Sequence, residues 1–123
     1  MALAKTITTC VTNQTVATTT EYALASCTAV DCTAAIIADV EGLCTYHASG
    51  TLAAVIRIYA SQDGTNYGSS PVDQFTMPFL AGNARRWSKT IIPSAKYLKA
   101  TIYNADAAQS ITVAYVYLTI QTA

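Results

Sequence analysis

Hydrophobic and polar residues alternate along most of this chain, with the period of two that is typical of half-buried β-strands. The clearest example is the segment 52–59, where Leu52, Ala54, Ile56 and Ile58 share one face and Val55, Arg57 and Tyr59 the other. Similar patterns predict strands over residues 6–12, 16–24, 33–43, 87–92, 97–103 and 111–120. Residues 34–40 also permit a helix because alanine favours one, but the flanking threonine and β-branched residues favour a strand.

Turn signals separate these segments, among them Asn13-Gln14, Gly64 and Gly82-Asn83. Together they give about eight strands, as in a sandwich or jelly roll. The sequence therefore predicts an all-β protein, a jelly-roll-like antiparallel β-sandwich forming a single domain over residues 1–123. Its predicted core is Ile36, Val40, Ile56, Ile58, Leu98 and Ile102.

The last predicted strand, residues 111–120, departs from simple alternation. One face would carry Ile111, Val113, Tyr115 and Tyr117, and the other Ala114, Val116, Leu118 and Ile120. A strand with one solvated face should alternate apolar with polar residues. We expect this strand either to lie between two covered layers or to contact another subunit through Tyr115 and Tyr117.

The composition is rich in apolar residues and poor in charge. Hydrophobic residues make up 52% of the chain and charged residues 11%, while 19 threonines supply polarity without charge. Seven basic residues balance seven acidic ones, which argues against binding to nucleic acid or to an anionic membrane. The N-terminus lacks the apolar run of a secretory signal, so we expect synthesis in the cytoplasm.

Four cysteines lie in the first 44 residues of the chain: Cys10, Cys27, Cys32 and Cys44. They allow three disulfide pairings, and their spacing fits no common zinc pattern. We expect buried free thiols first, disulfides second and a metal third, and no cofactor.

Three groups of residues suggest chemistry, and each has a simpler structural explanation. The segment Asp63-Gly64-Thr65-Asn66 could bind calcium, but a plain turn is favoured because further carboxylates are missing. Asp39 and Glu41 lie two residues apart on one strand face, unlike the carboxylates of a glycosidase, which flank a cleft. His47 has no nucleophile motif near it. We therefore expect no enzyme activity.

Aromatic residues are better candidates for an interaction site. The loop 61–78 offers Tyr67, Phe75 and Met77 as anchors for a partner, and long loops often carry binding. Trp87 and Tyr67 could instead form a platform for a glycan, as in carbohydrate-binding β-sandwich modules. A secreted adhesin or pilus-like subunit is a further alternative.

Two stretches, VIRIYASQDGTNY and KYLKATIYNADAAQSITVAYVYLTI, resemble small all-β virion proteins of tailed bacteriophages. The resemblance covers roughly residues 30–120. It implies a capsid decoration, head-tail or tail accessory protein that is made in the host cytoplasm and resides in the virion. Its expected partners are other virion proteins and copies of itself, with a trimer favoured.

Overall fold

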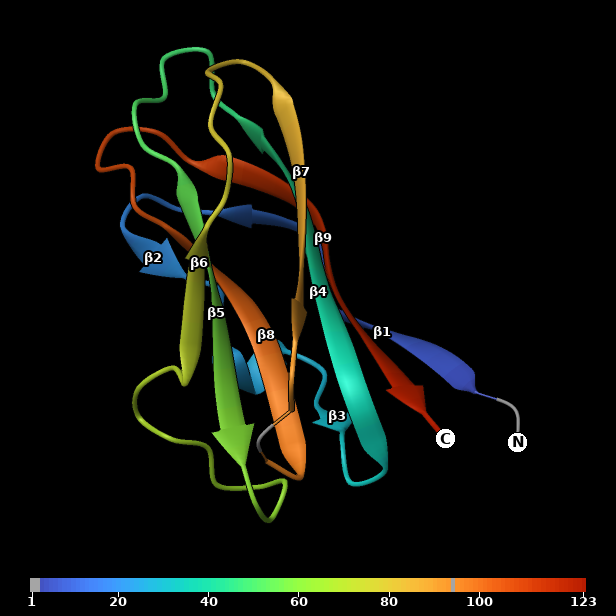
Figure 1. Ribbon diagram of the computed structural model, residues 1–123. Coiled ribbons are helices and arrows are strands. Elements are labelled where there is room, and N and C mark those ends of the chain that lie inside the picture. The colour runs from blue at the N-terminus through green and yellow to red at the C-terminus, as the bar shows by residue number, and fades with distance from the viewer. Residues whose placement is uncertain (1–2, 94) are drawn as a thin grey trace.

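The computed structural model describes residues 3–93 and 95–123, which fold into two antiparallel β-sheets packed face to face (Figure 1). The strands are β1 (Ala4–Val16), β2 (Thr20–Glu21), β3 (Val30–Asp31), β4 (Ala35–Tyr46), β5 (Ala54–Ser61), β6 (Asp73–Thr76), β7 (Ala84–Ile91), β8 (Tyr97–Asn104) and β9 (Ile111–Thr122). A single 3-10 turn, η1 (Leu24–Ser26), is the helical element of this described part. It is too short to cross a membrane.

The strand order confirms the predicted all-β sandwich. Sheet A has the order β1-β9-β4-β7, and sheet B the order β2-β8-β5-β6 with β3 also paired to β8. If β2 and β3 are taken as one interrupted strand, the eight strands form the two sheets of a jelly roll. The described residues therefore form nine strands instead of the predicted eight, because β2 and β3 are separate strands that both pair with β8.

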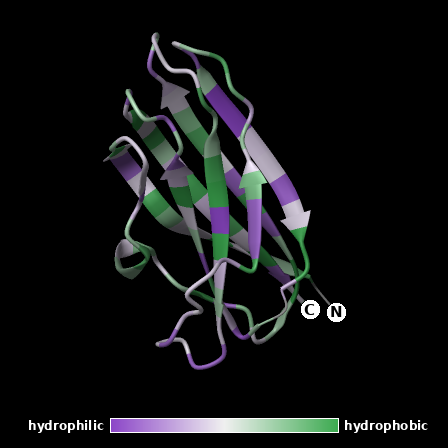
Figure 2. Cartoon of the chain, turned by 90° about the vertical axis from the view of Figure 1, so that its left-hand side faces the viewer, coloured by the Kyte–Doolittle hydropathy of each residue, from purple (hydrophilic) through white to green (hydrophobic). Residues whose placement is uncertain are grey.

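The core lies between the sheets, and Figure 2 shows hydrophobic and hydrophilic bands alternating along their strands. Five of the six predicted core residues are buried there: Val40, Ile56, Ile58, Leu98 and Ile102. The prediction for Ile36 was wrong, since 52% of it is exposed. The register of β4 against β9 shifts between Ala35 and Ile37, so Ile36 is bulged out of the alternation.

The N-terminal strands also differ from the expectation. The turn predicted at Asn13-Gln14 does not form, because β1 continues to Val16 and absorbs Asn13 with a φ of 45°. The strand predicted over residues 16–24 shrinks to β2, because Thr19 adopts a φ of 47° and bends the chain. The predicted irregular segment 61–78 contains β6, which pairs with β5.

A β-bulge in β9 changes which of its side chains face the core. Val113 pairs with Cys44 and Tyr115 with Leu43, which leaves Ala114 as an extra residue opposite β4. Val113 and Val116 are both fully buried although they are three residues apart. The side-chain parity therefore switches at Ala114, and a single face of β9 supplies the core along its whole length. The prediction that two apolar faces run the length of this strand was wrong.

Candidate functional site

Sheet A packs against sheet B on one side. On its other side, the outer face, no further strand or helix of the described residues packs against it (Figure 1). Tyr115 and Tyr117 lie at its centre, on β9, with parallel rings whose centroids are 3.8 Å apart. Next to them, β1, β4, β7 and β9 line an open hollow of about 220 Å³. Its polar and apolar lining includes Lys5, Ile37, Asp39, Thr90, Thr119 and Gln121.

Charged residues from two neighbouring strands hold Tyr115, one member of this tyrosine pair. The Tyr115 hydroxyl donates to Oε2 of Glu41 on β4 and accepts a bond of 3.1 Å from Nε of Arg86 on β7. Nε of Arg86 lies 4.0 Å from Oε2 of Glu41, and 65% of the Arg86 side chain is exposed. Burial, together with the bond to Glu41, raises the pKa of Tyr115. The result is a fixed aromatic ridge beside a largely exposed arginine, and tyrosine and arginine are both enriched at protein interfaces.

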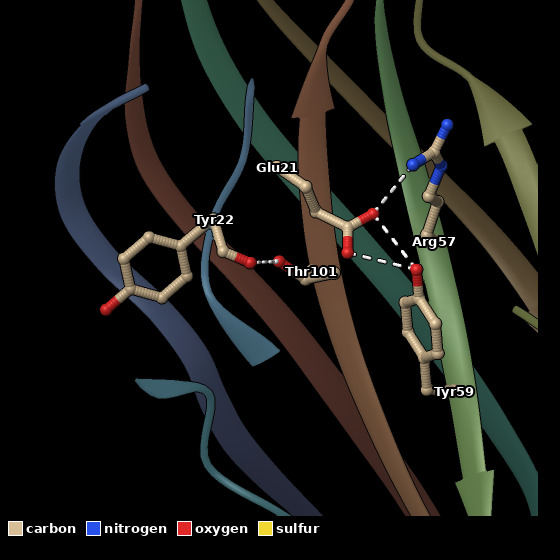
Figure 3. Close-up of polar contacts among 5 residues, drawn as sticks. All are labelled: Glu21, Tyr22, Arg57, Tyr59 and Thr101. Atoms are coloured by element: carbon tan, nitrogen blue, oxygen red, sulfur yellow. Dashed lines mark hydrogen bonds and ion pairs between the residues drawn. The ribbon is translucent and has the colours of Figure 1, made fainter. Parts of the chain in front are cut away.

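On the outer face of sheet B, side chains of β2, β5 and β8 bond to other parts of the chain (Figure 3). Glu21 accepts bonds from Arg57 Nη1 at 2.9 Å and from the Tyr59 hydroxyl at 3.0 Å. The Thr101 hydroxyl donates to the carbonyl of Tyr22 at 2.7 Å. The bond to Glu21 raises the pKa of Arg57, and burial raises that of Tyr59. These contacts fasten Glu21 and Tyr22, which lie beside β8, to side chains of β5 and β8.

The loop after β5 covers a second part of that face. The ring centroid of Tyr67 lies 4.8 Å from Nζ of Lys99, which in turn donates to the Leu24 carbonyl at 3.0 Å. The Tyr67 hydroxyl is buried, and burial raises its pKa. Tyr67 is therefore half-buried in its own fold instead of being presented as a free anchor.

The other predicted anchors pack between the sheets. Met77 is only 2% exposed, so the expectation that it is available to a partner was wrong. Phe75 and Trp87 pack together with ring centroids 5.3 Å apart, where β6 and β7 flank the open side of the sandwich. Trp87 thus contacts Phe75, and Tyr67 contacts Lys99, so the structure does not bring Trp87 and Tyr67 together as a platform.

The segment at Asp63 is the plain turn that the sequence favoured over a calcium site. Its Oδ1 accepts bonds from the backbone amides of Thr65 and Asn66 at 2.8 Å and from the Ser61 hydroxyl at 2.9 Å. These donors hold the pKa of Asp63 well below its usual range. Both lone-pair directions of that oxygen are occupied by protein, and Gly64 supplies a φ of 80°.

The remaining candidates have structural roles. His47 accepts a bond from the Ser49 amide through Nδ1, which closes a turn. The four cysteines are buried free thiols, as expected, and burial raises the pKa of Cys10 and Cys32 to about 11. Within residues 3–93 and 95–123, no cluster of three histidine, cysteine or acidic residues is placed to hold a metal ion.

Sequence reasoning selected Tyr115 and Tyr117 but missed their partners Glu41 and Arg86. All four side chains lie on the outward parity of their strands. The alternation along each strand therefore indicates that these side chains face outward. It does not show that they meet, because that depends on the pairing of β4 with both β7 and β9.

No family model matches the chain, and a search of curated proteins gave no match. Seven chains of solved structures match it. One comes from Bacillus endospore appendages, described as a novel family of disulfide-linked pili; it is 17% identical, has a TM-score of 0.53, and the alignment covers 98% of this chain and 87% of that one. Another is the enzymatically active domain of tailspike protein 4 from bacteriophage CBA120, at 12% identity and a TM-score of 0.49, covering 96% of this chain and 19% of that one. The likeness to the appendage protein is one of fold.

Proposed function

We propose that this protein is a non-enzymatic structural subunit of a virion, which assembles with copies of itself and with other virion proteins through the outer face of sheet A. One observation carries the proposal. On the outer face of sheet B, Arg57, Tyr59 and Lys99 bond to other parts of the chain, whereas the outer face of sheet A carries a fixed aromatic ridge, Tyr115 and Tyr117, beside an open hollow. Aromatic rings with polar tips and an exposed arginine suit a protein partner.

The groups that could carry catalysis are engaged in structural contacts, which supports a non-enzymatic role. The Asp63 carboxylate and His47 Nδ1 both accept backbone amides that close turns. Burial raises the pKa of the Cys10 and Cys32 thiols to about 11, which leaves little thiolate at neutral pH.

The virion assignment rests on the sequence resemblance to tailed-phage proteins. A pilus-like subunit is the second candidate, favoured by the likeness in fold to the endospore appendage protein. Both candidates are polymers or particles of repeated subunits, and both need an exposed contact surface. A trimer stays a prediction from the resemblance alone.

The test is the double variant Tyr115→Lys, Tyr117→Lys. It removes the aromatic ridge and places two ammonium groups beside Arg86, so it should fold but stay monomeric at concentrations where the parent assembles. Native mass spectrometry and co-sedimentation with virions measure this. The control is Leu52→Lys, Leu80→Lys, which changes two exposed apolar residues in loops, 50% and 44% exposed.

The two experiments together separate the candidates. Co-sedimentation of the parent with virions, lost in the double variant, supports the virion role, whereas self-assembly into fibres without virion binding supports the pilus-like role. A parent that is monomeric at high concentration and joins no particle would contradict both.

A further inference from the structure

The four edges of the two sheets are protected to different degrees. An unpaired edge strand can pair with another chain, and proteins guard such edges with charge or by keeping the strand short. Strand β7 carries Arg85, Arg86 and Lys89. Strand β6 has four residues, beginning with Asp73, and β2 and β3 have two residues each. Strand β1 has 13 residues, and the first half of this strand has a single charged residue, Lys5, near its beginning.

The open part of β1 is well defined. At Cys10, the carbonyl accepts a bond of 3.4 Å from the Thr28 amide, so another segment of the chain reaches β1 there. Before Cys10, residues 4–9 are exposed or half-buried and pair only with β9 in the register of the sheets. Figure 1 shows this half of β1 at the right-hand margin of the molecule. Its sequence, AKTITT, has one charge and high β propensity.

We infer that this edge pairs with the same edge of a second copy, in an antiparallel, two-fold contact centred on Ile7. In a two-fold pair of this kind the outer faces of both sheets are continuous, so paired residues must share a face. Centring on Ile7 pairs Ile7 with Ile7, Thr6 with Thr8, and Lys5 with Thr9. The contact joins two copies of sheet A into one sheet of eight strands.

This register is favoured by the side chains. Ile7 is 64% exposed and lies on the outer face, so the contact covers an apolar side chain from each copy. Centring on Lys5 instead would place two like charges directly opposite each other, which is unfavourable. The ladder over residues 5–9 also ends where Thr28 contacts Cys10, so no part of the fold has to move.

The inference goes beyond the proposed function because it uses the edge of sheet A and not its outer face. A two-fold contact closes a dimer. We therefore expect the parent to form assemblies with even multiples of the 13.0 kDa chain.

Cross-linking of Ile7→Cys tests the register directly. Opposed residues of antiparallel strands have Cα atoms about 4.5–5.5 Å apart, within the range of a disulfide. With oxidised glutathione, the two introduced thiols give up two electrons and two protons to form one disulfide, and the glutathione disulfide is reduced to two thiols. We expect a covalent dimer on a non-reducing gel. Ile92→Cys is the control, since Ile92 is 81% exposed but lies outside β1.

Native mass spectrometry of Ile7→Lys tests the energetics. Opposed lysines should weaken the dimer roughly tenfold or more, whereas Ile92→Lys should leave it unchanged. The Tyr115→Lys, Tyr117→Lys variant should keep the Ile7→Cys cross-link, so the edge contact and the outer-face contact can fail separately. Equal cross-linking of Ile7→Cys and Ile92→Cys, or a trimer that Ile7→Lys leaves intact, would overturn the inference.

Discussion

At the scale of single residues, a buried polar pair organises the connection between β8 and β9. Asp106 is only 2% exposed. Its carboxylate accepts hydrogen bonds from the backbone amides of Thr51, Ala108 and Gln109 at 2.8–3.0 Å. Asn104 is fully buried and donates to the Val16 carbonyl at 3.2 Å. The two side chains thus join the end of β1, the loop before β5 and the start of β9.

This arrangement predicts how stability depends on pH. The backbone donors lower the pKa of Asp106 to about 2 from the usual value of about 3.9. A lowered folded-state pKa gives stability that is present above about pH 4 and is lost as the pH falls toward 2. Asp106→Asn should therefore have a lower Tm than the parent at pH 7, with a gap that narrows between pH 4 and pH 2. Calorimetry over that range measures it.

The matched control is Asp73→Asn, which removes an exposed carboxylate from the edge strand β6. Its melting curve should follow the parent at each pH. A gap between the parent and Asp106→Asn that is the same at pH 2 and pH 7 would show that the carboxylate charge does not stabilise the fold.

At the scale of elements, the sequence predicts strands better than it predicts their irregularities. Ile56 and Ile58 were assigned correctly because β5 alternates strictly along its length. Ile36 and Ala114 were not, because a bulge is defined by the register against a partner strand that is distant in sequence. The same holds for the site: Tyr115 could be chosen from its own strand, but Glu41 and Arg86 join it only through the pairing of β4 with both neighbours.

The bulge at Ala114 leads to a prediction for β9. Deleting Ala114 would remove the residue that is extra opposite β4 and restore strict alternation, so Val113 and Ile111, now 0% and 3% exposed, would still face the core. Deleting Tyr117, which lies in a regularly alternating stretch, would instead turn Leu118 and Ile120, now 0% and 9% exposed, to the outer face. Exposing two such side chains should lower the free energy of unfolding by about 3 kcal/mol or more, or prevent folding. Ala114→Gly keeps the chain length and should cost about 1 kcal/mol or less. Urea denaturation of the parent and the three variants measures this, and a deletion of Ala114 that lowers the midpoint as much as the deletion of Tyr117 would contradict the assigned bulge.

At the scale of the whole molecule, the two outer faces of the jelly roll differ, since sheet B's is tied by bonds to the rest of the chain and sheet A's carries the aromatic ridge, and the cysteines lie inside. Cys10, Cys27 and Cys32 are 3–5% exposed, and Cys44 is fully buried with its thiol 3.9 Å from the Met77 sulfur. The appendage pili that share this fold are described as disulfide-linked.

The thiols should consequently react only when the sandwich opens. A buried thiol of raised pKa is both inaccessible and little ionised, so labelling by a thiol reagent has to await unfolding. For a domain of ordinary stability, native labelling should be roughly a thousandfold slower than labelling in denaturant, where all four cysteines react. Thr65→Cys, at an exposed position of the Asp63 turn, should add one thiol that labels at once. Mass spectrometry counts the labels over time. Rapid native labelling of any of the four, or parent assemblies that run as disulfide-linked multimers on a non-reducing gel, would show that these cysteines link subunits after all.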